Sequence, residues 1–166
     1  MSNELFSTVI DSPVNALTIV ASHDGVRAIL WPDADPERVR LADTTDRPSH
    51  PVIAATVEQL TEYFAGERFE FDVPLDAVGT EFQRSAWVSL RTIPYGTTIS
   101  YGEQAEQMGD RRKARAVGAA NGRNPISIVV PCHRVVGANG ALTGFAGGVD
   151  TKAWLLAHEQ RSAPQV

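Results

Sequence analysis

The sequence predicts a mixed α/β fold in two domains, the first built from an antiparallel sheet and one helix and the second mostly helical. Three observations lead to this prediction: short apolar runs separated by turn residues before residue 31, helix-start signals after residue 79, and a reversal of charge between the halves. Residues 1–79 contain 14 acidic residues and five arginines, whereas residues 80–166 contain ten basic and six acidic residues. We therefore place the domains at 1–76 and 80–166, joined by a linker that begins at Pro74.

The amino-terminal half should contain three antiparallel strands, a surface loop and one helix. Turn residues separate the strands, and Asp24-Gly25 is a hairpin signal. The expected strands are Leu5–Ile10, Leu17–Val20 and Val26–Leu30, with a further strand over Phe69–Val73. A loop over residues 32–51, rich in Asp, Pro and Thr, precedes the helix. The apolar face of that helix is expected to consist of Ile53, Val57, Leu60 and Phe64.

In the carboxy-terminal half, two capping boxes predict where helices begin. In Thr80-Glu81-Phe82-Gln83 and Ser100-Tyr101-Gly102-Glu103, the hydroxyl and the side chain three positions later can each satisfy a free backbone N–H. Asp110 could cap a third helix closed by Gly122, and two short helices joined by a tight turn are typical of a helix-turn-helix. A last helix is expected from Thr151 to about Gln160, capped by Asp150.

Composition excludes several classes of protein. A single cysteine rules out an internal disulfide framework and a Cys-rich zinc site. His23, His50 and His158 lack a convincing ligand set, so we expect no metal site. We also expect no cofactor. No apolar stretch approaches membrane-spanning length, and the start of the chain lacks the pattern of a secretory signal. A free thiol without an export signal fits the cytoplasm.

The single cysteine lies in Pro131-Cys132-His133-Arg134, between apolar residues. A free cysteine on a buried strand is usually an inert core residue. Here an imidazole and a guanidinium follow it, and such neighbours can favour the thiolate, which is the reactive form. The functional hypothesis is a nucleophilic cysteine, and the alternative is a packed thiol that happens to precede a histidine.

The third predicted helix is rich in small residues and begins in a cluster of basic ones. Small side chains would let it approach a nucleic-acid groove while the cations contact phosphates. Its middle lacks residues that read base edges, which favours binding without sequence preference. The alternative is a helix packed into a core. Arg115 discriminates between the two, because a core helix seldom buries an unpaired arginine.

Several motifs occur in the order and spacing found in the O6-alkylguanine-DNA alkyltransferases. They are Tyr101, Arg115, Asn124-Pro125, Pro131-Cys132-His133-Arg134-Val135 and Leu155-Leu156-Ala157-His158-Glu159. Thr80-Glu81-Phe82-Gln83, Ile93-Pro94-Tyr95-Gly96 and Gly147-Gly148 also look like that family. The resemblance covers residues 80–166 closely, whereas the amino-terminal half is similar in layout and carries no sharp motif.

The resemblance implies a ribonuclease-H-like supporting domain and a DNA-binding, alkyl-transfer domain with a winged-helix-like helix-turn-helix. The implied partner is double-stranded DNA that carries O6-alkylguanine, bound through the minor groove. We expect a monomer in solution with no obligate protein partner, and assembly of several molecules on DNA is left open. The damaged base would be flipped out of the stack. Its alkyl group, or that of O4-alkylthymine, would pass irreversibly to the cysteine, so each molecule would act once.

The resemblance also implies a role for each matching catalytic residue. Cys132 would be the nucleophile, and His133 its base through a bridging water, since adjacent side chains on an extended segment point to opposite sides. Glu159 would orient His133, as the carboxylate does in a serine triad, unless it is a surface residue of the last helix. Asn124 would organise the turn around the cysteine, or simply end a helix. Tyr101 would disfavour the unflipped nucleotide and donate a hydrogen bond to the guanine ring, or be an ordinary partly buried tyrosine.

The remaining expectations concern DNA contact and the base pocket. Arg115 would fill the gap left by the flipped base. The expected DNA-contacting residues are Tyr101, Arg115, Ala116, Ala119 and Arg123, and the expected pocket residues are Val135, Phe145 and Ala146. Phe145 and Ala146 depart from the family pattern, where many members have Tyr and some have Ser, so any hydroxyl contact to the base from these positions is lost.

Two other classes of function remain open from the sequence. A cysteine hydrolase would also use Cys132 and His133, but it would turn over repeatedly. An alkyltransferase-like protein would recognise alkylated DNA without repairing it, and the reactive cysteine argues against that class.

Overall fold

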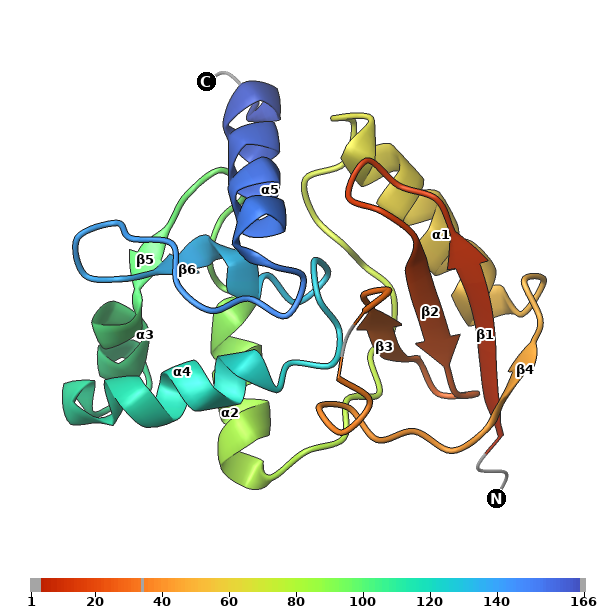
Figure 1. Ribbon diagram of the computed structural model, residues 1–166, viewed down its shortest axis with the longest axis horizontal. Helices are drawn as coiled ribbons and strands as arrows, with labels where there is room; N and C mark the ends of the chain where they lie inside the picture. The colour runs from red at the N-terminus through yellow and green to blue at the C-terminus, as the bar shows by residue number, and fades with distance from the viewer. Residues whose placement is uncertain (1–3, 34, 165–166) are drawn as a thin grey trace. The chain divides into compact units, whose positions relative to one another are not determined.

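The computed structural model describes residues 4–33 and 35–164, and the chain divides into two compact units, residues 1–78 and 79–166. The first unit holds a sheet with one helix, and the second unit is mostly helical (Figure 1). The predicted mixed α/β class is therefore confirmed. Within the described ranges, no helix has both the length and the apolar character needed to cross a membrane.

The sheet of the first unit has the strand order β3-β2-β1-β4. β1 (Leu5–Ile10), β2 (Leu17–Ala21) and β3 (Val26–Leu30) are antiparallel neighbours, as predicted. β4 (Thr44–Asp46) pairs in parallel with β1 and lies inside the segment predicted to be a loop. Its three residues are all exposed, so no apolar alternation marks it in the sequence.

Helix α1 (Pro51–Phe64) packs against the sheet, and its buried face differs from the predicted one (Figure 1). Ile53 and Leu60 are buried as expected, whereas Val57 and Phe64 are only half-buried. The buried positions include the polar residues Thr56 and Gln59. Their polar groups are satisfied, because Thr56 donates to the Val52 carbonyl and Gln59 bonds to Asp72.

The strand predicted over Phe69–Val73 is wrong. The backbone N–H of Asp72 donates to the side chain of Gln59 instead of to a neighbouring strand. The chain pairs with the sheet only further on, where Val26 donates to the Pro74 carbonyl and Asp76 donates to the Val26 carbonyl, each at 2.8 Å. This contact closes the first unit just before residue 78.

In its described residues, 79–164, the second unit contains four helices, two 3-10 helices (η) and a pair of two-residue strands. They are α2 (Glu81–Leu90), β5 (Ile99–Ser100), α3 (Tyr101–Gln107), η1 (Arg111–Lys113), α4 (Ala114–Gly122), η2 (Cys132–Arg134), β6 (Val135–Val136) and α5 (Val149–Ser162). Both predicted capping boxes are confirmed, at Thr80 and at Ser100.

Two other helix starts differ from the predictions. Asp110 caps η1 rather than α4, because its side chain accepts a hydrogen bond from the Arg112 N–H and the chain passes through one 3-10 turn first. Helix α5 begins at Val149, after Gly148, so Asp150 lies in the first turn and is not the cap. Gly148 has a φ of 94°, a conformation open to glycine, which sets this start.

We predict that Gly25→Ala destabilises the first unit by about 1–3 kcal/mol. A Cβ at Gly25 would lie 2.7 Å from the Pro74 carbonyl oxygen, which is backbone already bonded to Val26 and cannot move aside freely. Urea unfolding followed by circular dichroism measures the effect. Gly122→Ala is the control, since its Cβ would meet no atom within 4 Å; equal losses in the two variants would contradict the prediction.

Candidate active site

Two short strands bring distant parts of the chain together. β5 and β6 are parallel, with Ile99 opposite Val135 and Ser100 opposite Val136. Tyr101 directly follows β5, and the cysteine segment 132–134 directly precedes β6. The pairing therefore joins the segment that leads into Tyr101 to the segment that follows Cys132, although 31 positions separate the two residues in the sequence.

Asn124 ties down the turn that leads to the cysteine. Its side-chain N–H donates to the Val130 carbonyl at 2.9 Å, and its side-chain oxygen accepts from the Ile126 N–H at 3.0 Å. Asn124 is fully buried, which the alternative of a simple helix-ending residue does not require. Its amide satisfies backbone groups of a turn that is not part of any helix or strand.

The cysteine segment is a 3-10 helix, not the extended strand predicted from its β-branched neighbours. Cys132 is buried and is the only cysteine in the chain. Successive side chains of a 3-10 helix are about 120° apart, because it has 3.0 residues per turn. Cys132 and His133 therefore point in different directions. The reason to expect no direct contact between the sulfur and the imidazole still applies, although the predicted extended conformation is wrong.

Glu159, on helix α5, is the centre of a buried network of polar groups. Its carboxylate accepts from Arg134 Nε at 2.8 Å and Arg134 Nη2 at 3.1 Å, and lies 2.6 Å from His133 Nε2. The Gly96 N–H donates to the same carboxylate at 3.3 Å, and Arg134 Nη1 donates to the Ile93 carbonyl at 2.7 Å. Glu159 has no exposed surface, so the alternative of a surface carboxylate is wrong.

The contact with Glu159 fixes the proton on the imidazole of His133. An ionised carboxylate only accepts hydrogen bonds, so Nε2 carries the hydrogen and Nδ1 of the neutral ring carries a lone pair. Nδ1 is buried and has no hydrogen-bond partner among the described residues. The neutral ring thus presents one unused acceptor, which is the property that a general base requires.

Burial and neighbouring charges set the protonation of this pair. Burial lowers the pKa of His133, and the positive charges of Arg134 and Lys152 lower it further, against the opposing effect of Glu159. Burial alone would raise the pKa of Glu159, but the hydrogen bond from His133 and the bonds and charge of Arg134 hold it far below its usual value. The resting pair is therefore a neutral imidazole beside an ionised carboxylate.

Lys152 is a feature of the site that sequence reasoning missed. It lies on α5 and is fully buried, and its ammonium donates to the Thr143 carbonyl at 3.0 Å. It also lies 5.8 Å from the centre of the Tyr101 ring. The Thr143 hydroxyl bonds to the Tyr101 hydroxyl at 3.2 Å. Lysine is seldom fully buried, and only its place at the start of a predicted helix could have pointed to it.

The predicted pocket residues differ in burial. Val135 is fully buried on β6. Phe145 and Ala146 are half-buried in the segment that follows Thr143, the residue held by Lys152. The segment with the predicted pocket wall is therefore anchored to α5 and to Tyr101 through Thr143.

Helix α4 has one packed face and one exposed face. Val117 and Ala120 are buried, and the Ala120 carbonyl accepts from Trp87 Nε1 of α2 at 2.8 Å. Of the residues predicted to contact DNA, Arg115, Ala116, Ala119 and Arg123 are exposed, and Tyr101 on α3 is half-buried. The core-helix alternative thus describes one side of α4 only.

Ion pairs within the unit neutralise part of the basic cluster. Arg111 pairs with Glu106 at 2.8 Å, and Arg112 pairs with Asp110 at 3.0 Å. Among residues 4–33 and 35–164, Arg115 makes no ion pair. Exposed pairs contribute at most about 1 kcal/mol, so both paired arginines remain available to a phosphate.

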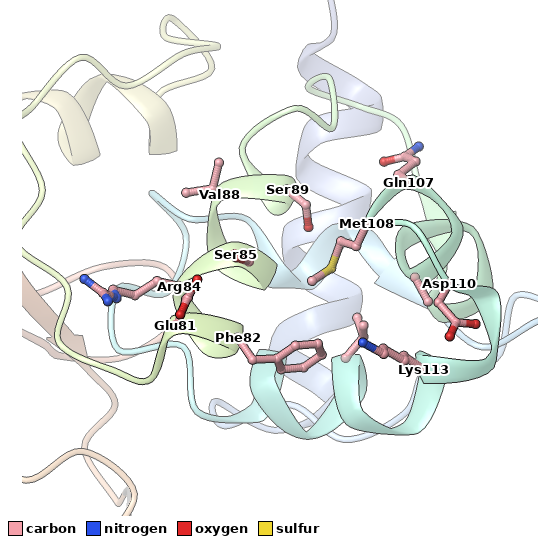
Figure 2. Close-up of a pocket in the computed structure, with 12 residues that line it drawn as sticks. Glu81, Phe82, Arg84, Ser85, Val88, Ser89, Gln107, Met108, Asp110 and Lys113 are labelled. Carbon is pink, nitrogen blue, oxygen red and sulfur yellow. The ribbon is translucent and has the colours of Figure 1, made fainter.

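A groove of about 720 Å³ is lined by residues of α2, of α3 and of the start of α4. Figure 2 shows Phe82 and Met108 inside it, with the Lys113 side chain beside the Phe82 ring, 5.8 Å from its centre. None of the predicted catalytic or pocket residues lines this groove. In the described part of the chain, no cluster of three or more His, Cys, Asp or Glu side chains could hold a metal ion.

Two family models match the chain. Residues 81–161 match "6-O-methylguanine DNA methyltransferase, DNA binding domain", and residues 5–77 match "6-O-methylguanine DNA methyltransferase, ribonuclease-like domain". The two matches meet where the chain divides into its compact units.

Relatives match over most of the chain. A protein of Mycolicibacterium paratuberculosis named methylated-DNA--protein-cysteine methyltransferase is 52% identical over 93% of this chain and 92% of its own length. A protein of the same name from Shigella flexneri is 47% identical over 93% of this chain and 95% of its own. The crystal structure titled Mycobacterium tuberculosis OGT in complex with DNA has a TM-score of 0.88 and 46% identity, over 96% of this chain and 95% of that one.

We predict that Glu159→Gln lowers the free energy of unfolding by about 3–5 kcal/mol at pH 7, because it leaves the buried Arg134 without its charged partner. Glu106→Gln is the matched control, since it breaks an exposed pair with Arg111 and should cost less than about 1 kcal/mol. Chemical unfolding measures both, and equal losses would contradict a special role for the buried pair.

Acid titration of the same two variants is the second readout. The pKa values of both His133 and Glu159 are lower in the folded protein, so their contributions to stability are present at neutral pH and are lost on acidification. The loss of stability should begin below pH 6.5, the ordinary pKa of histidine, and continue below pH 4.5, the ordinary pKa of glutamate. Glu159→Gln should flatten the curve below pH 4.5, and Glu106→Gln should leave it steep.

Proposed function

The chain belongs to the 6-O-methylguanine DNA methyltransferase family, and we propose that it repairs DNA by moving the alkyl group of O6-alkylguanine onto Cys132. The observation that carries the proposal is the network around Glu159, which leaves His133 neutral with one unused buried acceptor, next in sequence to the only cysteine. No cofactor is required, because the damaged base is itself the alkyl donor.

The transfer is a single displacement at carbon. A bridging water carries the Cys132 thiol proton to His133 Nδ1, and the thiolate sulfur attacks the alkyl carbon. The new S–C bond forms as the bond from that carbon to guanine O6 breaks, and the bonding electrons remain on the base. Glu159 holds the imidazolium that results, and Arg134 keeps Glu159 ionised so that it does not take the proton.

Tyr101 assists the departure of the base. Its hydroxyl donates to the guanine ring as negative charge builds there, which lowers the cost of expelling an anionic leaving group. The Thr143 bond to this hydroxyl and the Lys152 bond to the Thr143 carbonyl support the placement of the ring. The product is an S-alkylcysteine, and without a step that removes the alkyl group each molecule acts once.

DNA binding is assigned to α3 and α4 as a helix-turn-helix in the minor groove. The exposed face of α4 presents Ala116 and Ala119, whose small side chains allow close approach to the DNA backbone. Arg115 enters the stack in place of the flipped base, which Val135, Phe145 and Ala146 receive in the pocket. Asn124 keeps the turn before Cys132 in place, and Arg123 contacts the backbone.

The remaining parts of the proposal are less specific to the site. Residues 1–76 form a supporting domain, and residues 80–166 form the domain that binds DNA and transfers the alkyl group. We further propose that the protein is a cytoplasmic monomer that can assemble on DNA. O4-alkylthymine is a second substrate to examine with the same chemistry.

The main test is the intact mass of the protein after mixing with one equivalent of duplex DNA that carries O6-methylguanine. The wild type should gain one methylene unit on Cys132 with no added cofactor, and Cys132→Ala should gain none while it still binds the duplex. Alkyl removal by Cys132→Ala would refute the nucleophile.

The same measurement separates the rival functions. Repeated turnover with an unmodified Cys132 would indicate a hydrolase. Tight binding of alkylated DNA with no change in the mass of either partner would indicate an alkyltransferase-like binding module.

We predict that Arg115→Ala weakens duplex binding and slows transfer, with less than about 0.5 kcal/mol change in stability, because the side chain is exposed. Arg91→Ala is the matched control, since Arg91 is also exposed but lies at the end of α2. Fluorescence anisotropy at several salt concentrations measures both variants. A wild-type affinity that does not fall with salt would contradict phosphate binding, because counterion release makes such contacts salt-dependent.

A further inference from the structure

The turn before the cysteine contains a strained residue that the proposed mechanism does not use. Ile128 has a φ of 75°, in the left-handed region that β-branched residues rarely adopt. The Val129 N–H donates to the Ser127 carbonyl at 2.9 Å, which closes a three-residue turn with Ile128 at its centre. A γ-turn with a positive φ at its centre is the rarer and more strained of the two γ-turn forms.

A second three-residue turn follows directly. Pro131 has φ −84° and ψ 65°, and the Cys132 N–H donates to the Val130 carbonyl at 2.9 Å. These values are those of the relaxed, inverse γ-turn. The chain therefore reaches Cys132 through two tight turns in series, and the first of them sets the direction in which the second begins.

The surrounding structure holds the strained turn from both ends. Val130 donates to the Ile126 carbonyl at 2.9 Å, and Asn124 bonds to backbone groups of both Ile126 and Val130. Ile128 itself is 1% exposed, so its side chain is fixed in the core. Residues in sparsely populated conformations persist only where their surroundings over-determine them, and they cluster at functional sites.

We propose that Ile128 is a positioning residue for alkyl transfer, whose buried, β-branched side chain holds the strained turn that aims Cys132. The proposal rests on the proposed function. Glycine adopts a φ of 75° without strain, so the backbone conformation alone would favour glycine here. The branch at Cβ of isoleucine restricts rotation of its side chain and of its own backbone. This restriction keeps the Cys132 sulfur in one position.

The test compares Ile128→Ala and Ile128→Gly with the same two changes at Ile126. Ile126 lies in the same turn and is also fully buried, but its φ is not positive. At Ile126 the alanine variant should have the higher unfolding midpoint, because glycine adds freedom to the unfolded chain. At Ile128 this order should reverse, because only glycine relieves the strain. Alanine more stable than glycine at both positions would overturn the proposal.

Single-turnover alkylation of Cys132 by duplex O6-methylguanine supplies a readout that a purely structural role would not move. Ile128→Gly should be the more stable variant and yet the slower one, with a maximal rate about 10- to 100-fold below wild type and an unchanged half-saturating DNA concentration. A structural role alone would make the more stable variant the faster one. A wild-type rate in Ile128→Gly would overturn the proposal, whereas a wild type that binds DNA without alkylation would overturn the proposed function.

Ile128→Leu covers the case in which both truncated variants fail to fold. Leucine keeps the buried volume and the Cβ but removes the branch at Cβ, which adds to the steric conflict that every Cβ meets at positive φ. Ile128→Leu should therefore lower the unfolding midpoint less than Ile126→Leu does. A larger loss at Ile128 than at Ile126 would overturn the proposal.

Discussion

The second unit depends on a buried carboxylate that holds three of its parts together. Glu159 joins α5 to η2 through His133 and Arg134, and to the turn after α2 through Gly96. Burial of a carboxylate is costly unless cationic and hydrogen-bonding partners surround it, so all of these elements must be in place together. The position and the tautomer of His133 follow from the same contact. Structure and chemistry in this unit therefore depend on one side chain.

Arg134 has a different role from the one its place beside Cys132 suggests. Next to a thiol, a guanidinium would be expected to favour the thiolate. Here the guanidinium is bonded to Glu159 and to the Ile93 carbonyl. The positive charge of Arg134 balances the negative charge of the Glu159 carboxylate, and it lowers the pKa of His133 rather than raising it. Under the proposed function, this arrangement keeps the imidazole able to accept a proton, because a histidine already charged at rest could not act as a base.

Signals local in sequence were sufficient for much of the fold. The capping boxes at Thr80 and Ser100 and the hairpin at Asp24-Gly25 each depend on residues within four positions of one another. Features that depend on distant partners were missed, among them β4, the buried polar face of α1 and the burial of Lys152. The 3-10 conformation of the cysteine segment was also missed, because its apolar, β-branched flanks are equally typical of a strand. The candidate site was predicted from the family motifs, because the contact between His133 and Glu159 spans 26 positions and has no local signature.

The two faces of α4 have a consequence for how the protein would find its target. The packed face, with Val117 and Ala120, fixes the helix against α2, and the exposed face presents alanines and an arginine. Alanine offers no hydrogen bond to a base edge, so this face has few groups that could distinguish one sequence from another. Under the proposed function, selectivity must then arise after binding, from which base enters the pocket and carries a carbon that Cys132 can accept. Affinity for DNA and recognition of the lesion are thus assigned to different parts of the second unit, and the turn between Asn124 and Cys132 is the covalent link between them.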